Sequence, residues 1–291
     1  MPVALSPHWK AYLALAFGVL CIGLSAIFVK IAAVPGVVSA FYRVFFASFV
    51  LVPLWLLRRP KLPRGAILRA TLLGGVFFAT DLALWNASLL LTGAGVATLL
   101  ANNAPLWVGL AAWLFLHERL TANFWVGLFV ALGGMVLIVG GTGIHFDGSN
   151  LGNLMAISAS VFYAAYLLTT QRVRTAMDTV SFMAISVGVG ALLLLIAALI
   201  FGQPLTGYAP NQWLALLALG LISQVGGWLS INYSLGHIPA TRVSVTLLAQ
   251  AVVTTLVAVP ILGELPTPIQ LVGGALVLGG IYWVYNGRAR A

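Results

Sequence analysis

Long runs of apolar residues, separated by short gaps that contain Gly, Pro or charged residues, cover almost the whole chain. A helix needs about 20 mostly apolar residues to cross a bilayer. The runs are continuous and do not alternate between apolar and polar positions, as barrel strands would. The pattern predicts an all-α integral membrane protein with ten transmembrane helices, at residues 11–33, 37–57, 66–91, 94–116, 122–141, 150–172, 180–202, 211–236, 239–262 and 267–286. The first run contains Lys30 and is longer than the apolar part of a signal peptide, so we expect a retained helix.

One stretch of the chain occurs twice. Residues 86–141 match residues 232–287 without a gap, with roughly a quarter of the positions identical, and such a repeat sets the architecture of a fold. The shift is constant at 146 positions, so Glu118 corresponds to Glu264. Gly133-Gly134 likewise corresponds to Gly279-Gly280.

The repeat divides the ten helices into two halves of five. Because five is an odd number, the second half enters the membrane from the opposite side, and the two repeats are inverted. Inverted repeats are typical of transporters whose halves face each other across a site near the middle of the membrane. We therefore predict two domains, residues 1–145 and residues 146–291.

Composition supports the membrane class and charge sets the orientation. The chain of 291 residues is 62% hydrophobic and only 7% charged, whereas a water-soluble domain has about 25% charged residues. Its net charge of +9 does not indicate a nucleic-acid partner, because the basic residues lie between the apolar runs. With the N-terminus inside, all basic residues except Lys30 and Arg43 fall in cytoplasmic segments or at the cytoplasmic ends of helices, which predicts two cytoplasmic termini. These residues are Lys10, Arg58, Arg59, Lys61, Arg64, Arg69, Arg119, Arg172, Arg174, Arg242, Arg288 and Arg290.

The layout of each half resembles a known family. Each half ends in an apolar helix, a Glu-containing turn and a Gly-rich last helix; the turns are 117–120 (His-Glu-Arg-Leu) and 263–265 (Gly-Glu-Leu). Two such halves resemble the two EamA domains of the drug/metabolite transporter superfamily, over nearly the whole chain. Within it the chain resembles the YddG-type exporters of aromatic amino acids. This resemblance implies a multi-pass protein of the bacterial inner membrane and a small-molecule substrate. The second turn lacks the basic residue after its Glu, so the first half keeps the family signature better.

Few charged side chains lie inside the predicted helices. Asp81 is in the middle of the third helix, and Lys30 and Arg43 are nearer the outer ends of the first two. Polar groups in hydrocarbon are costly and usually face a bundle interior or a wet cavity. Two interpretations stay open. Asp81 forms a structural ion pair with Lys30 or Arg43, or it carries a proton or anchors the amino group of a substrate.

Uncharged polar and aromatic side chains gather in the third, fourth, sixth, eighth and ninth helices. We expect these five helices to line a cavity that accepts a small amphipathic solute with a ring, and the plainer helices to face lipid or serve as scaffold. The alternative is that the polar groups join helices to one another, at about 0.6 kcal/mol each. The predicted substrate-binding residues are Asp81, Trp85, Asn102, Tyr163, Tyr166, Gln224, Trp228, Asn232 and Gln250.

A second group of residues is assigned a gating or structural role. Pro105 lies inside the predicted fourth helix, where it removes one backbone hydrogen bond and is expected to kink the helix. The complete group is Lys30, Arg43, Pro105, Glu118 and Glu264.

These features predict a secondary active transporter of amino acids, aromatic and other neutral ones, that works by alternating access; the family resemblance implies that the direction is export. The alternatives are an exporter of purines, nucleotide sugars, organic cations or drugs, and more distantly a membrane-embedded enzyme. The chain has no Gly-rich phosphate loop, and His117-Glu118 is not followed by the second His of a zinc site. We therefore expect no catalysis, no metal or other cofactor and no nucleic-acid partner. The partners are a small-molecule substrate and the bilayer, and a monomer suffices while an oligomer stays possible.

Overall fold

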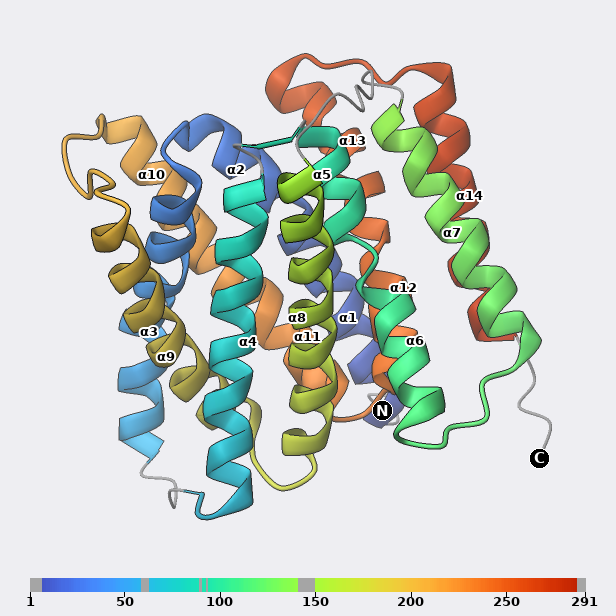
Figure 1. The fold of residues 1–291 in the computed structure, drawn as a ribbon, viewed down its shortest axis with the longest axis horizontal. Coiled ribbons are helices and arrows are strands. Elements are labelled where there is room, and N and C mark those ends of the chain that lie inside the picture. The colour runs from blue at the N-terminus through green and yellow to red at the C-terminus, as the bar shows by residue number, and fades with distance from the viewer. Residues whose placement is uncertain (1–6, 59–62, 89–90, 93, 141–149, 287–291) are drawn as a thin grey trace, which may run out of the picture.

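The protein is a bundle of helices (Figure 1). The computed structural model describes residues 7–58, 63–88, 91–92, 94–140 and 150–286. Within these ranges it contains no strand, and nine helical spans are long and apolar enough to cross a membrane. The helices are α1 (Pro7–Gly23), α2 (Ser25–Ala32), α3 (Gly36–Arg58), α4 (Ala66–Ser88), α5 (Ala94–Ala101), α6 (Ala104–Leu114), α7 (Ala122–Gly140), α8 (Asn150–Arg174), α9 (Thr179–Ile200), α10 (Pro210–Ala218), the π-helix η1 (Leu219–Trp228), α11 (Leu229–Leu235), α12 (Ala240–Leu247), α13 (Ala249–Leu262) and α14 (Pro268–Asn286).

The fourth predicted span is broken into two helices. It consists of α5 and α6, separated by a turn at Asn102-Asn103. Pro105 lies in the first turn of α6, where the missing N–H of a proline removes no intrahelical hydrogen bond. The expected kink inside a continuous helix is therefore wrong, because the helix ends before the proline. The ninth span breaks between α12 and α13, at Leu248, which is the repeat counterpart of Asn102.

The eighth span also departs from the regular helix that the sequence predicts. Its middle part, Leu219–Trp228, is a π-helix. A π-helix has i→i+5 hydrogen bonds and is frequent at functional sites. The segment contains Gln224 and Trp228, whose side chains are 1% and 4% exposed. The repeat counterpart of this segment lies in α4, which is a regular α-helix.

The last helices of the two repeats pack along each other, α7 against α14 (Figure 1). The bounds of α14 are those of α7 shifted by the repeat distance of 146 residues. A Cβ atom on Gly134 would lie 2.5 Å from the carbonyl oxygen of Gly273, and one on Gly127 would lie 2.6 Å from that of Gly280. The two backbones are therefore in direct contact at small residues, as is common between membrane helices.

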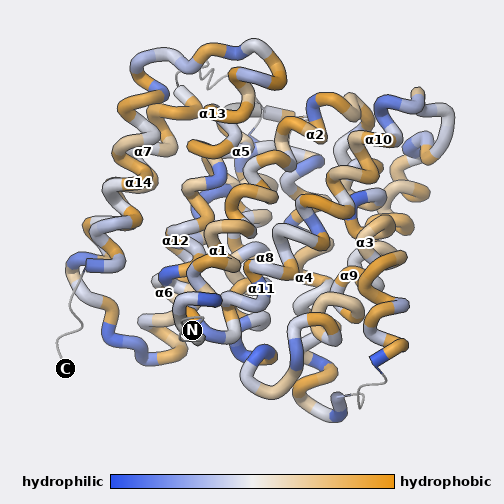
Figure 2. Tube along the Cα trace, turned by 180° about the vertical axis from the view of Figure 1, so that it is seen from behind, coloured by the Kyte–Doolittle hydropathy of each residue, from blue (hydrophilic) through white to orange (hydrophobic). Residues whose placement is uncertain are grey.

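The surface of the bundle is consistent with a membrane environment. Strongly hydrophilic segments gather mainly at the two ends of the bundle, and hydrophobic segments lie between them (Figure 2). Large apolar side chains are exposed on the outside, for example Phe49, Phe129 and Leu192, which are 63%, 57% and 60% exposed. A soluble monomer rarely exposes large apolar patches, whereas a lipid-facing surface requires them.

Candidate functional site

A cavity of about 850 Å³ lies between the two repeats. Side chains from α1, α2, α3, α4, α5, α7, α8 and α13 line it, together with the end of η1. It extends to Glu264 and Gln270, near the start of α14. We call this the open end of the bundle. The opposite end, where α6 ends and α11 meets α12, contributes no lining residue.

Four charged residues line the cavity, two at each of two levels. Deeper in the bundle, Arg43 from α3 donates a hydrogen bond from Nε to Oε1 of Gln224 at 2.8 Å. Asp81 from α4 lies within electrostatic range of Arg43. At the open end, Lys30 forms an ion pair with Glu264. Both of these side chains are more than half exposed, at 58% and 54%.

The carboxylate of Asp81 has no hydrogen-bond or ion-pair partner among the described residues, since Lys30–Glu264 is the one ion pair found there. The interpretation that pairs Asp81 with Lys30 is therefore wrong for this conformation, because Lys30 is bound to Glu264. A direct pair with Arg43 is not formed either. A half-buried carboxylate without a partner is unusual. The Asp81 oxygens are therefore available to a ligand in the cavity.

An aromatic cluster forms the floor of the cavity. The ring of Trp228 lies 5.1 Å from that of Phe78, 5.7 Å from that of Tyr163 and 5.3 Å from that of Tyr166, in edge-to-face geometry. Such pairs are the preferred arrangement of aromatic rings. The Nε1 atom of Trp228 is buried and has no hydrogen-bond partner in the described structure. The floor therefore combines flat apolar faces with an unused donor.

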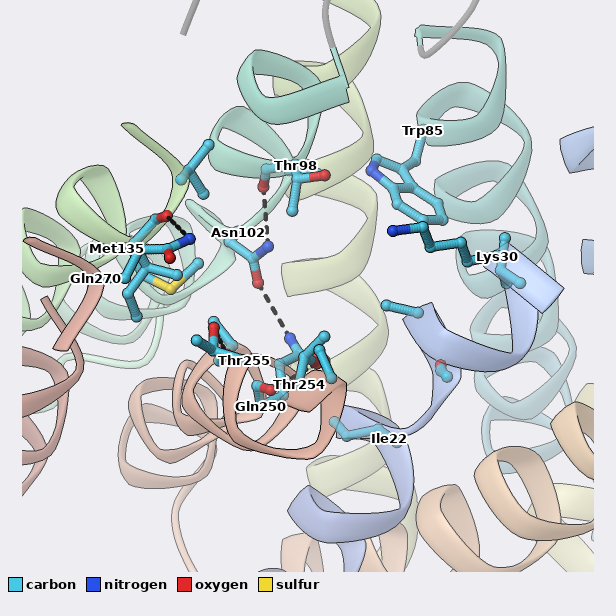
Figure 3. A pocket seen from close by; sticks show the side chains of 18 of the residues that line it. Ile22, Lys30, Trp85, Thr98, Asn102, Met135, Gln250, Thr254, Thr255 and Gln270 are labelled. Atoms are coloured by element: carbon cyan, nitrogen blue, oxygen red, sulfur yellow. Dashed lines mark hydrogen bonds between the residues drawn. The ribbon is translucent and has the colours of Figure 1, made fainter. Parts of the chain in front are cut away.

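The two helix breaks meet at the cavity (Figure 3). Nδ2 of Asn102 donates to the carbonyl oxygen of Thr98 at 2.8 Å, and Nε2 of Gln250 donates to Oδ1 of Asn102 at 3.1 Å. Figure 3 shows Asn102 between these two partners. The side chain of Asn102 thus adds a second hydrogen bond to the Thr98 carbonyl oxygen, which also accepts from the backbone N–H of Asn102, and it connects the break in one repeat to the start of α13 in the other.

The predicted site residues divide into two groups. Nine of them line the cavity: Lys30, Arg43, Asp81, Trp85, Asn102, Tyr163, Trp228, Gln250 and Glu264. The other five do not. Gln224 and Tyr166 lie behind the lining and hold Arg43 and Trp228, and Asn232 donates to the hydroxyl of Tyr166 at 2.7 Å. Pro105 is buried in α6, and Glu118 lies in the loop between α6 and α7.

The structure also adds lining residues that the sequence analysis did not select. Met135 and Ile138 come from α7, which was expected to face lipid or act as scaffold; it exposes Phe129 and packs on α14, and in addition it lines the cavity. An apolar helix gives no sign in its sequence of which face borders a cavity. Phe78 was identifiable, because it lies one turn before Asp81 on the same face of α4.

Comparisons with known proteins agree with this architecture. Curated relatives include the uncharacterised transporter YdfC of Bacillus subtilis (strain 168), which is 26% identical over 247 residues, covering 84% of this chain and 80% of that protein. A probable terminal-alkyne amino-acid exporter of Streptantibioticus cattleyicolor is 30% identical over 192 residues, covering 65% of this chain and 63% of that protein.

A solved structure matches the fold of this chain, and a family model matches its sequence. A solved crystal structure matches 97% of this chain and 99% of its own with a TM-score of 0.83 and 21% sequence identity, a likeness that concerns the fold alone. The model of the EamA-like transporter family matches residues 9–140 and again residues 150–286. The two matched segments are the two halves of five spans that frame the cavity. The chain is a multi-pass membrane protein and belongs to the EamA-like transporter family.

Proposed function

We propose that this transporter exports small zwitterionic metabolites, amino acids with aromatic or other apolar side chains, by alternating access across the bacterial inner membrane. The observation that carries the proposal is the placement of Asp81 and Arg43 in one cavity above an aromatic floor. A carboxylate matches the amino group of an amino acid. A guanidinium matches its carboxylate, and the rings match its side chain.

The geometry supports two separate contacts for a zwitterion. Arg43 uses Nε for Gln224, which leaves the terminal nitrogens of its guanidinium for a ligand. Asp81 has no partner in the described structure, so both of its oxygens can accept hydrogen bonds. One relative is named as an amino-acid exporter, which is consistent with this chemistry.

The charge balance of the cavity disfavours phosphate-bearing substrates. Lys30 is paired with Glu264 at the open end, so among the described lining residues Arg43 is the one basic group without an ion-pair partner. A nucleotide sugar carries several negative charges and would need a cluster of basic side chains. Purines and organic cations remain the alternatives to test.

Charge also supports an orientation. Arg58, Arg69, Arg119 and Arg174 lie at the end opposite the cavity mouth, as does Arg242 at the start of α12. Basic residues favour the cytoplasmic side. We therefore assign the opposite end to the cytoplasm, together with both termini, and the open end to the exterior.

Counterflow in proteoliposomes tests the substrate. Purified protein is reconstituted with unlabelled phenylalanine inside, and labelled phenylalanine is added outside without an imposed ion gradient. We expect uptake above that of empty liposomes, and competition by other apolar amino acids. Absence of uptake with phenylalanine and with every other neutral amino acid would reject the substrate assignment, and purines and organic cations would be the next substrates to test.

Substitutions in the aromatic floor should weaken substrate binding. Trp228 is 4% exposed, so its replacement by Ala would remove core packing as well as a ligand contact. Trp228→Phe and Tyr163→Ala are cleaner variants. Because an aromatic pair contributes about 0.5–1.5 kcal/mol beyond its buried area, we expect each to raise the half-saturating substrate concentration several-fold.

The matched control for the floor variants is Trp283→Ala. Trp283 lies on α14, is 50% exposed and does not line the cavity. It should leave counterflow unchanged. Wild-type saturation curves for both floor variants would show that the cluster does not contact the substrate.

A further inference from the structure

We infer that Gln224 sets the charge selectivity of the cavity. It holds the guanidinium of Arg43 through a neutral hydrogen bond, which leaves the positive charge of Arg43 for the carboxylate of a substrate. This inference rests on the proposed function, because it names the residue through which the same site selects zwitterions over simple amines. Gln224 does not line the cavity, so it is a positioning residue that acts through Arg43.

The contact between these two side chains joins the two repeats. Arg43 belongs to α3 in the first repeat, and Gln224 belongs to η1 in the second. Gln224 is buried, and its Oε1 accepts the hydrogen bond from Nε of Arg43 at 2.8 Å. A guanidinium has several N–H donors, and among the described residues Arg43 makes no second hydrogen bond. The donors on its two terminal nitrogens therefore remain for a ligand.

Close packing of η1 on two sides fixes the position of Gln224. On one side, Gly220 lies one turn before Gln224, and a Cβ atom on it would lie 3.2 Å from the carbonyl oxygen of Arg43. On the other side, Oγ of Ser223 donates to the carbonyl oxygen of Cys21 in α1 at 3.1 Å. The π-helical segment is therefore held between α3 and α1, and it keeps the amide of Gln224 against the guanidinium.

The repeat indicates that this polar pair belongs to the site and not to the fold. At the shift of 146 residues, Gln224 corresponds to Phe78 and Arg43 corresponds to Val189. Both counterparts are apolar, although α4 packs against α9 as η1 packs against α3. The fold therefore packs the same two helices without a hydrogen-bonded pair. Polar groups inside a membrane bundle are costly, so the pair is explained by what it does for the cavity.

The neutral charge of Gln224 determines what the site can bind. Asp81 and Arg43 offer one negative and one positive charge, and neither forms an ion pair in the described part of the chain. A zwitterion satisfies both. Gln224→Glu would give Arg43 a charge-assisted hydrogen bond, about twice as strong as a neutral one, and would neutralise its charge. Asp81 would then be uncompensated, and the site would favour an amine without a carboxylate.

A purely structural role for Gln224 predicts a different result. If the amide served only to join η1 to α3, a carboxylate of nearly the same size would accept the same hydrogen bond from Arg43. The helices would be held at least as firmly, and the order of ligand affinities would not change. The two roles of Gln224 therefore differ in ligand preference and not in stability.

Ligand-dependent thermal unfolding tests the inference. Purified protein in detergent is heated with each of three ligands that share a phenyl ring: phenylalanine, phenethylamine, which lacks the carboxylate, and hydrocinnamate, which lacks the amino group. A ligand that binds the folded state raises the melting temperature according to its concentration and affinity. An apparent affinity is therefore obtained even for a variant that does not transport. Gln224→Glu is compared with the wild type and with Gln224→Met, which removes the acceptor without adding a charge.

We expect the wild type to bind phenylalanine more tightly than either of the other ligands. Gln224→Glu should weaken phenylalanine and hydrocinnamate by about tenfold or more and make phenethylamine the tightest ligand. Gln224→Met should weaken the two carboxylate-bearing ligands several-fold and leave phenethylamine unchanged. The matched control is Gln171→Glu, because Oε1 of Gln171 also accepts a hydrogen bond, from the N–H of Ala240, and Gln171 does not line the cavity. It should keep the wild-type order of affinities.

The inference is overturned if Gln224→Glu keeps the wild-type preference for phenylalanine. It is also overturned if Gln224→Met makes phenethylamine the tightest ligand as Gln224→Glu does, because loss of position and not charge would then be the cause. If Gln224→Glu does not fold, an unchanged affinity of Gln224→Met for hydrocinnamate rejects the inference.

The wild type tests the proposed function separately. Stabilisation of the wild type by phenethylamine alone, or by none of the three ligands, would reject zwitterions as substrates and the role of Gln224 with them. A wild type that prefers phenylalanine, together with a Gln224→Glu variant that does the same, would leave the proposed substrate in place and reject the role of Gln224 alone.

Discussion

Asp81→Asn is expected to reduce amino-acid counterflow more than any other single substitution in the cavity. The change keeps the size of the side chain and removes the charge that would bind the substrate amino group. A hydrogen bond to a charged group contributes about 1.5–3 kcal/mol. That corresponds to a roughly tenfold to hundredfold loss of affinity. The measurement is the half-saturating phenylalanine concentration in counterflow, taken at two pH values.

The pH series separates the two functional roles of Asp81. An amine anchor predicts a loss of affinity at both pH values. A proton carrier predicts that exchange depends on pH in the wild type and that Asp81→Asn abolishes this dependence. The matched control is Asp178→Asn, since Asp178 caps α9 by accepting hydrogen bonds from the N–H groups of Val180 and Ser181 and does not line the cavity. Equal effects of the two variants would reject a role for Asp81 in binding.

Gly134→Ala is expected to destabilise the whole protein, by about 1–3 kcal/mol, as overpacking of a close interface does. The added Cβ would lie 2.5 Å from the carbonyl oxygen of Gly273 and 2.7 Å from the backbone nitrogen of Val277. Both contacts are backbone atoms, so no rotamer change relieves them, and α7 must move away from α14. Thermal unfolding of the purified protein in detergent measures the loss.

The neighbouring glycine supplies the control for this variant. A Cβ on Gly133 would meet nothing within 4 Å. Gly133→Ala should therefore be neutral or stabilising, by up to about 1 kcal/mol, because Ala is the better helix former. The two variants have the same composition and almost the same position along the helix. Equal melting temperatures would contradict the close α7–α14 contact.

The repeat in the sequence led to several features of the structure. The paired glycines mark the contact between α7 and α14, and the shift of 146 residues aligns the bounds of both last helices. It also aligns Asn102 with Leu248, where the fourth and ninth spans break. The break itself was not predicted, because neither position carries a proline. Pro105 follows the break and marks the start of α6.

Polar residues in apolar helices pointed to many of the cavity residues, but not to their arrangement. Asp81, Trp85, Asn102 and Gln250 were selected because polar groups avoid lipid. The same rule selected Asn232, which instead holds the hydroxyl of Tyr166 below the floor. A polar side chain that binds a substrate and one that binds a neighbouring helix are the same residue types, so the sequence does not distinguish the two roles.

The sequence by itself determined the membrane class, the two-repeat architecture and the family, because these follow from run lengths, repeat distance and residue type. Which polar side chains share one cavity was decided only by the tertiary structure. The ion pair of Lys30 with Glu264 joins residues 234 positions apart, and the π-helix places Gln224 behind Arg43. The conformation, open at one end and packed at the other, also needed the fold, because both states of an inverted repeat use the same sequence and differ only in which contacts are formed.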